Sequence, residues 1–242
     1  EYYTKRKSKN PISKISRSIE FKESIFLNEY AGKESLKKKA ISAPDSIKIQ
    51  EPIESKAIKN ISFPVVLKYS SPHLLHKTEL GAIRTNIKSI KELNLEFQNM
   101  KKLIDKAEAF ESTGVYFCEE MADVPIAELF LSFRSDPVFG KVMVVGMGGI
   151  YTEIFNDSKT LILPVSRQEL LSHLTDLKGY EIILGYRNKI KVNKKKLLNS
   201  LFNLIDFFLD ETNECVSLEI NPLFVYENSV KVIDCVMERK VS

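Results

Sequence analysis

The sequence predicts an α+β fold, in which strands and helices are mixed without the regular alternation of a doubly wound parallel sheet. Short apolar or alternating runs, of the kind that form strands, recur along the chain. Residues 89–110 carry apolar side chains near a spacing of 3.6, which predicts a long helix. No steady strand–helix–strand repeat links these segments, and this favours the α+β class.

Composition limits the kind of protein that this chain can be. With 242 residues, 43% of them hydrophobic and 28% charged, it can form one large or two small domains with a real core. The net charge of +4 is too small to indicate a nucleic-acid partner, and no apolar run approaches the length of a membrane span. Three cysteines without metal-type spacing are typical of reduced, buried thiols in a cytoplasmic protein.

The first part of the chain differs from the rest. Residues 1–22 are rich in serine and basic side chains and show no helical periodicity. We interpret them as a basic tail or a linker from an upstream domain. A transit-like segment, which is also Ser-rich, basic and poor in acids, is the alternative.

The remaining elements follow in order from local patterns. Helices are expected over 26–39, 51–60 (weakly), 89–110, 168–178 and 194–209. Strands are expected over 46–49, 63–67, 83–87, 115–118, 127–134, 141–145, 151–155, 160–163, 217–226 and 230–236.

The stretch after residue 63 gathers groups that could hold or receive a phosphoryl group. A short apolar strand ends on Lys68, and the following loop carries His73, His76 and Lys77. A lysine is a compact charge on a long stem, so a lysine at a strand end could reach a phosphate. The alternative is a solvated flank followed by ordinary surface histidines.

A second polar constellation lies near the C-terminus. If residues 227–228 form a two-residue hairpin loop, Asn221 lies opposite Asp234, and Glu219 shares their face. Such an oxygen-rich patch suits Mg²⁺, which completes its coordination with water and phosphate oxygens. The alternative is the polar outer face of an ordinary hairpin.

Two weaker signals lie between these constellations. Residues 118–121 follow a strand and precede Glu128, so backbone groups there could read an adenine edge while the carboxylate accepts from ribose hydroxyls. Residues 146–149 hold three glycines, which permit sharp turns and close approach of a ligand. A purely structural turn is the alternative.

Four stretches together resemble a known family. PVVLKYSSPHLLHKTELGAI, DPVFGKVMVVGMGGIYTEIFND, LKGYEIILGYR and LEINPLFVY occur in that order from about residue 27 to residue 236. In sequence and spacing they resemble the ATP-grasp beta subunit or domain of the ADP-forming acyl-CoA synthetases, typified by ADP-forming acetate–CoA ligase. The sequence departs from the usual family pattern at Ala82, Asn188 and Glu219.

The resemblance implies an ATP-grasp fold with ATP or ADP held between two α+β lobes, over residues 23–115 and 116–242, although the chain could cross between them. It implies that His76 takes part in a phosphoryl relay. The remaining implied roles concern the nucleotide and its metal ion. Contacts to the nucleotide are implied for Lys68, Lys77, Glu119, Met121, Glu128, Gly148 and Gly149, and Mg²⁺ ligation for Asn221, Asp234 and Glu219.

The function that the resemblance implies is phosphoryl transfer between a phosphohistidine and ADP, as one step of acid–CoA ligation. The partner would be a CoA-binding alpha subunit or domain, in a hetero-oligomer. Two alternatives stay open. One is a non-catalytic or regulatory ATP-grasp module that is fused to or partnered with an acyltransferase. The other is a carboxylate–amine ligase of the wider ATP-grasp class, which has no need of His76.

Overall fold

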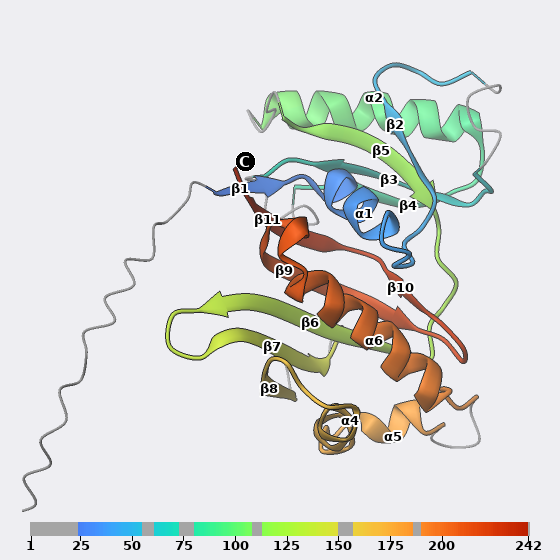
Figure 1. The fold of residues 1–242 in the computed structure, drawn as a ribbon. Helices are drawn as coiled ribbons and strands as arrows, with labels where there is room; N and C mark the ends of the chain where they lie inside the picture. Colours follow the sequence, from blue (N-terminus) through green and yellow to red (C-terminus); the bar gives the residue numbers. More distant parts are fainter. Residues whose placement is uncertain are drawn as a thin grey trace, which may run out of the picture.

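The computed structural model describes residues 24–54, 61–72, 80–107, 113–149, 157–185 and 190–241. Its strands and helices follow the order shown in Figure 1. The strands are β1 (Ser24–Leu27), β2 (Ser46–Ile49), β3 (Val65–Ser70), β4 (Ile83–Ile87), β5 (Val115–Glu120), β6 (Ala127–Asp136), β7 (Gly140–Met147), β8 (Ser158–Ile162), β9 (Cys215–Val225), β10 (Val230–Val232) and β11 (Cys235–Lys240). The helices are α1 (Glu29–Lys37), α2 (Ile90–Lys106), α4 (Arg167–Thr175), α5 (Tyr180–Ile183) and α6 (Lys194–Leu209), with a 3₁₀ turn η3 (Glu211–Asn213).

The described strands form two antiparallel sheets. The small sheet has the order β2-β5-β3-β4, and α2 packs across it in the upper part of Figure 1. The large sheet has the order β1-β11-β9-β6-β7-β8, and β10 also pairs with β9. Each sheet has its own apolar core, as expected when each must bury one face.

The two cores are built by amphipathic helices. Leu93, Phe97, Met100 and Ile104 of α2 recur at helical spacing and are buried against the small sheet. The buried side of α6 packs on the large sheet, where the Phe208 and Phe133 rings lie 5.5 Å apart. Among the described residues, no helix is both long and apolar enough to cross a bilayer.

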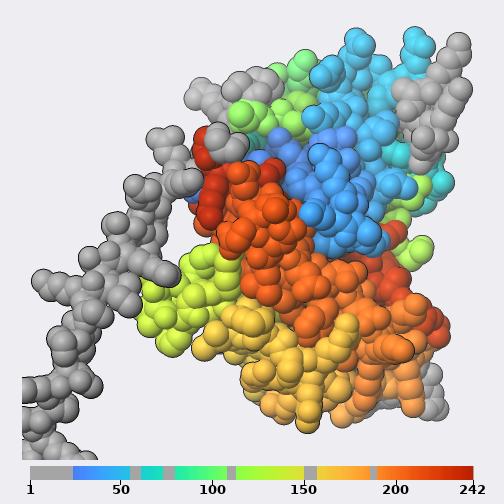
Figure 2. All heavy atoms as spheres, in the orientation of Figure 1, coloured from blue at the N-terminus to red at the C-terminus, as the bar shows by residue number. Residues whose placement is uncertain are grey.

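Helix α1 lies between the two sheets (Figure 1), where it packs on β1 and β11 of the large sheet and forms ion pairs with the small one. In Figure 2 the blue segment that includes α1 fills the space between the small lobe and the orange helix α6. Leu36 is buried in the core of the large sheet, and a Cβ on Gly32 would lie 3.0 Å from Cys235 Sγ. Glu29 and Lys33, also buried, face the small sheet instead. One short helix therefore serves both lobes.

The α+β prediction is confirmed, and β2, β4 and α6 begin and end where the sequence predicts. The helix expected from residue 26 is wrong at its start. Phe26 and Leu27 belong to β1, which pairs with β11 about 210 residues later, and Asn28 caps α1 by accepting a hydrogen bond from the Ala31 N–H at 3.0 Å. Residues 51–54 are not helical, and the rest of that weak helix and the 151–155 strand lie outside the described residues.

The expected division between lobes at residue 115 also differs from the sheets. Strand β5 was expected to open the second lobe, but it is hydrogen-bonded between β2 and β3 in the small sheet. Strand β1, expected in the first lobe, is an edge of the large sheet. The chain therefore crosses from the large sheet to the small one after β1 and returns after β5. The basic tail, 1–22, lies outside the described residues.

Substitution of Leu36 by alanine tests the importance of α1 to the large core. We expect Leu36→Ala to lower the free energy of unfolding by about 2–5 kcal/mol, because the side chain is fully buried and leaves a cavity. Chemical denaturation measures the loss. Leu95→Ala is the matched control, because Leu95 lies on α2 with 56% of its surface exposed, and it should change stability by less than about 0.5 kcal/mol. Equal losses would contradict the role assigned to α1.

Candidate functional site

Lys68 lies inside strand β3, two residues before its end, and not at the strand terminus as the sequence suggested. All six residues of β3 are buried, and Lys68 is only 4% exposed. The strand continues past Lys68 because Tyr69 and Ser70 still pair with β5. The ammonium group therefore lies between the small sheet and α1, where it needs charged partners.

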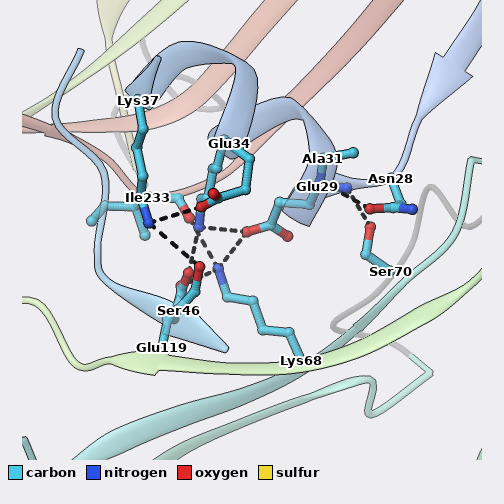
Figure 3. A network of polar contacts seen from close by, with 11 residues as sticks. Asn28, Glu29, Ala31, Glu34, Lys37, Ser46, Lys68, Ser70, Glu119 and Ile233 are labelled. Carbon is cyan, nitrogen blue, oxygen red and sulfur yellow. Dashed lines mark hydrogen bonds and ion pairs between the residues drawn. The ribbon is translucent and has the colours of Figure 1, made fainter. Parts of the chain in front are cut away.

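Lys68 belongs to a ring of four buried charges, three of which, Lys68, Glu29 and Glu119, are labelled in Figure 3. Its Nζ lies 2.7 Å from Glu29 Oε1 and 2.7 Å from Glu119 Oε1. Lys33 Nζ lies 2.7 Å from Glu29 Oε1 and 2.8 Å from Glu119 Oε2, which closes the ring. We call these four residues the charge ring. Its members alternate in sign and come from α1, β3 and β5.

The charge ring keeps Lys68 protonated. Burial alone would lower the pKa of Lys68, but the carboxylates of Glu29, Glu119 and Asp234 oppose this and raise the pKa well above its ordinary value. Both ammonium groups of the ring also lie 5.9 Å from the centre of the Phe117 ring, at the outer range of a cation–π contact. Lys68 thus carries a full positive charge at neutral pH.

Lys68 also joins the two sheets directly. Its Nζ donates a hydrogen bond to the carbonyl oxygen of Ile233 at 2.9 Å (Figure 3). Ile233 lies in the connection between β10 and β11 and directly precedes Asp234. The cationic group of the small sheet and the C-terminal hairpin of the large sheet therefore meet at one place.

The hairpin register agrees with the sequence prediction. Val230 pairs with Val225 and Cys235 pairs with Ile220, so Asn221 lies opposite Asp234. The ladder continues across the break between β10 and β11, where the Asn221 N–H donates to the Asp234 carbonyl oxygen at 3.2 Å. The two-residue loop at 227–228 is confirmed.

The polar face of this hairpin fits a divalent cation that binds together with phosphates. Glu219 and Asn221 point outward from β9, whereas Leu218 and Ile220 are buried in the core. Partial desolvation raises the pKa of the Glu219 carboxyl, and a cation would bind this carboxylate only in its deprotonated form. In the described part of the chain, no three His, Cys, Asp or Glu side chains lie close enough to hold a metal by themselves. Mg²⁺ usually takes few protein oxygens, with water and phosphate as further ligands, so Asn221, Asp234 and Glu219 stay predicted ligands.

Glu119 and Met121 lie where β5 leaves the small sheet. The Glu119 carboxylate faces Lys33 and Lys68 rather than an open adenine site, because the charge ring buries it. The Met121 N–H donates to the Pro64 carbonyl at 3.0 Å, and its side chain is 41% exposed. The adenine contacts implied for both residues stay predictions, and for Glu119 a contact through the side chain would require breaking an ion pair.

Glu128 lies against the glycine turn that follows β7. The Gly148 N–H donates to the Glu128 carbonyl at 2.7 Å, and a Cβ on Gly149 would lie 2.7 Å from Glu128 Oε2. Gly149 has φ +64°, a conformation that favours glycine. The structure therefore brings together the carboxylate and the glycine turn that the sequence singled out separately.

A family model described as an ATP-grasp domain matches residues 21–238. The chain belongs to the ATP-grasp family.

Several of its relatives are named as acid–CoA ligases. The chain is 31% identical, over 87% of its length and 90% of the relative, to the beta subunit of ADP-forming acetate–CoA ligase I of Pyrococcus furiosus. It is 30% identical, over 91% of its length but 31% of the relative, to an ADP-forming 4-hydroxybutyrate–CoA ligase of Nitrosopumilus maritimus. Among solved structures it resembles dinucleotide forming acetyl-coenzyme A synthetase 1 of Ca. Korarchaeum cryptofilum, in complex with coenzyme A, Ca-AMPCP and HgCl+, with a TM-score of 0.80, 25% identity and coverage of 89% of this chain and 93% of that one.

Local sequence patterns did not predict the burial of several charged residues of this ATP-grasp chain. Glu29 and Lys33 have the spacing of an ordinary exposed i, i+4 pair on a helix, and nothing nearby indicates their burial. Asp157 is also buried, and its two carboxylate oxygens accept hydrogen bonds from the Lys178 and Gly179 N–H groups at 3.0 and 2.9 Å. It thereby ties the start of β8 to the segment before α5.

The predicted phosphoryl-transfer loop leads into Gly81 and Ala82, just before the next strand. His73, His76 and Lys77 lie outside the described residues. Gly81, at the end of this loop, has φ +70°, which accounts for a glycine there. Ala82, where the family usually has a second glycine, is fully buried in the small core, and its methyl group is accommodated.

Because the Glu128 carboxylate lies close to Gly149, we expect a substitution of this glycine to affect ADP binding as well as the free energy of unfolding. Gly149→Ala and Gly140→Ala should each lower the free energy of unfolding by about 1–2 kcal/mol, because both glycines have positive φ. Only Gly149→Ala should also weaken ADP binding, by about tenfold, because the new Cβ displaces the Glu128 carboxylate, whereas nothing lies within 4 Å of a Cβ at Gly140. Denaturation and calorimetric titration measure the two effects, and equal ADP affinity in the two variants would contradict the assignment of Glu128.

Proposed function

We propose that this chain is the nucleotide-binding subunit or domain of an ADP-forming acid–CoA ligase, and that it moves a phosphoryl group between a phosphohistidine and ADP. One observation carries the proposal. The Lys68 ammonium of the small sheet lies 2.9 Å from the carbonyl that precedes Asp234, on the hairpin of the large sheet. This contact supports the proposal because it brings the cation proposed for phosphate binding next to Asp234, a proposed metal ligand.

The relatives support this proposal and indicate the partner. Two of them are named as beta subunits of ADP-forming acetate–CoA ligases, and this chain covers 90% and 84% of their lengths. This chain covers only about 30% of the length of other relatives, which are therefore about three times as long. We infer that a CoA-binding subunit or domain completes the enzyme, either as a separate chain or as another part of the same one.

The phosphates would bind beside Lys68 and Lys77, which neutralise negative charge as it develops on the transferred oxygens. Asn221, Asp234 and Glu219 would hold Mg²⁺, which supplies further charge neutralisation between the phosphates. Met121, Glu128, Gly148 and Gly149 would bind the adenosine part, together with the backbone at Glu119. These assignments follow from the resemblance, and two contacts support them: Lys68 reaches the residue before Asp234, and Glu128 lies against the turn at Gly148 and Gly149.

His76 would accept and return the phosphoryl group. A lone pair on its neutral imidazole attacks the terminal phosphorus of ATP, a P–N bond forms, and the P–O bond to ADP breaks with ADP leaving. In the direction of ATP synthesis, an ADP phosphate oxygen attacks the phosphohistidine phosphorus and the imidazole leaves. A covalent relay of this kind lets a phosphoryl group cross between two distant sites without meeting water.

A non-catalytic ATP-grasp module is the second candidate. It requires nucleotide binding but no phosphoryl transfer. The catalytic function is favoured because the sequence keeps all four proposed side chains, Lys68, His76, Asn221 and Asp234. A site that no longer catalyses a reaction would be expected to lose some of them.

The His76→Ala variant tests the relay on the chain alone. Incubation of the unsubstituted chain with ATP labelled at its γ-phosphate, and with Mg²⁺, should attach label that is stable to alkali and lost in acid, as expected for phosphohistidine. His76→Ala should abolish this label, because no other group would carry it. His173→Ala, on α4, is the matched control and should keep the label. Full labelling of the His76→Ala variant would contradict the relay.

Lys68→Met tests the phosphate site. We expect ADP affinity in the presence of Mg²⁺ to fall by at least about tenfold, because a charge-assisted contact is lost. We also expect the free energy of unfolding to fall by about 3–5 kcal/mol, because the substitution leaves two buried carboxylates with Lys33 alone. Calorimetric titration and denaturation measure both. Unchanged ADP affinity in a folded Lys68→Met variant would contradict the proposal.

A further inference from the structure

The charge ring leaves Lys68 no spare hydrogen-bond donor. An ammonium group has three N–H bonds, and those of Lys68 have three acceptors within 2.9 Å: Glu29 Oε1, Glu119 Oε1 and the Ile233 carbonyl oxygen. A phosphate oxygen can bond to this ammonium only by replacing one of them. The Ile233 carbonyl is the weakest competitor because it is the only neutral acceptor of the three.

Together with the nearby Asp234 carboxylate, the ring contributes to the charge that a phosphate meets beside Lys68. Its two lysines and two glutamates cancel, so the ring as a whole is neutral although Lys68 is charged. Half of these charges come from α1, since Glu29 and Lys33 both lie on that helix. Lys33 is completely buried beside the two carboxylates. Asn28 caps the start of the helix, and the Glu29 N–H donates a hydrogen bond of 2.8 Å to Ser70 Oγ, which holds this end against β3.

We propose that Glu29 and Lys33 are positioning residues for phosphate binding, which hold Lys68 at the lobe interface and set its effective charge. This inference rests on the proposed function, because it assumes that phosphates bind beside Lys68. Glu29 and Glu119 keep the ammonium in place while a phosphate oxygen replaces the Ile233 carbonyl. Lys33 cancels the carboxylate charge that would otherwise repel the phosphate.

Variants that unbalance the ring in opposite directions test the inference. Lys33→Met leaves a net charge of about −1 in the ring and should weaken ADP binding in the presence of Mg²⁺ by roughly tenfold, through repulsion in a poorly screened site. Glu29→Gln leaves about +1 and should strengthen ADP binding by several-fold. The double variant Glu29→Gln/Lys33→Met is neutral again, and its affinity should lie between those of the single variants.

A purely structural role predicts a different result. Removing either buried charge would then weaken ADP binding, and the double variant would be no better than the worse single variant. That outcome, measured by calorimetric titration on the full chain, would overturn the inference. Denaturation of each variant checks that it is folded at the assay temperature. If Lys33→Met fails to fold, comparison of Glu29→Gln with the double variant still decides the sign of the charge effect.

A control separates this inference from the effect of overall charge and from the proposed function. Lys39→Met makes the same change in net charge at an exposed ion pair with Asp210, 3.2 Å away, and should leave ADP affinity unchanged. If the unsubstituted chain does not bind ADP with Mg²⁺, the proposed function itself fails. If the chain binds ADP but the single variants change affinity in the same direction, only the inference about the charge ring fails.

Discussion

The need to keep a buried ammonium group charged constrains the rest of this structure. Taking the Lys68 ammonium out of water costs on the order of several kcal/mol, and this is offset only when its N–H groups find good acceptors. The acceptors come from α1, from β5 and from the connection between β10 and β11. One side chain therefore fixes a helix, a strand of the small sheet and a turn of the large sheet relative to one another.

Helix α1 has its position for the same reason. It has nine residues, and a helix of that length is marginal in water without tertiary contacts. Its contacts divide by face: Leu36 enters the large core, Gly32 permits close approach to Cys235, and Glu29 and Lys33 face the small sheet. Loss of the contacts between the helix and the small sheet would break two of the four ion pairs of the charge ring, Lys68–Glu29 and Lys33–Glu119, so the position of the helix and the charge ring are linked.

Local sequence patterns predicted what depends on local structure. The α6 helix and the register of the β9–β10 hairpin follow from apolar spacing and a two-residue loop, and both agree with the prediction. Phe26 and Leu27 were assigned to a helix because the partner of β1 is about 210 residues away, where no local pattern can show it. The charge ring was missed for a related reason: Glu29 and Lys33 have the spacing of an exposed pair, and only tertiary packing buries them.

The cation and the proposed metal ligands are not independently placed, because one strand register sets both. Ile233 takes part in the ladder by donating its N–H to the Pro222 carbonyl at 3.1 Å, while its own carbonyl accepts from Lys68. A shift of one residue between β9 and this turn would put Asn221 and Asp234 on opposite faces of the hairpin and would also withdraw the Ile233 carbonyl from Lys68. The burial of Leu218 and Ile220 on the core side opposes such a shift. The apolar core of the large sheet therefore sets how the lysine of the other sheet meets the hairpin, and the fold fixes the distance between this lysine and the proposed metal ligands.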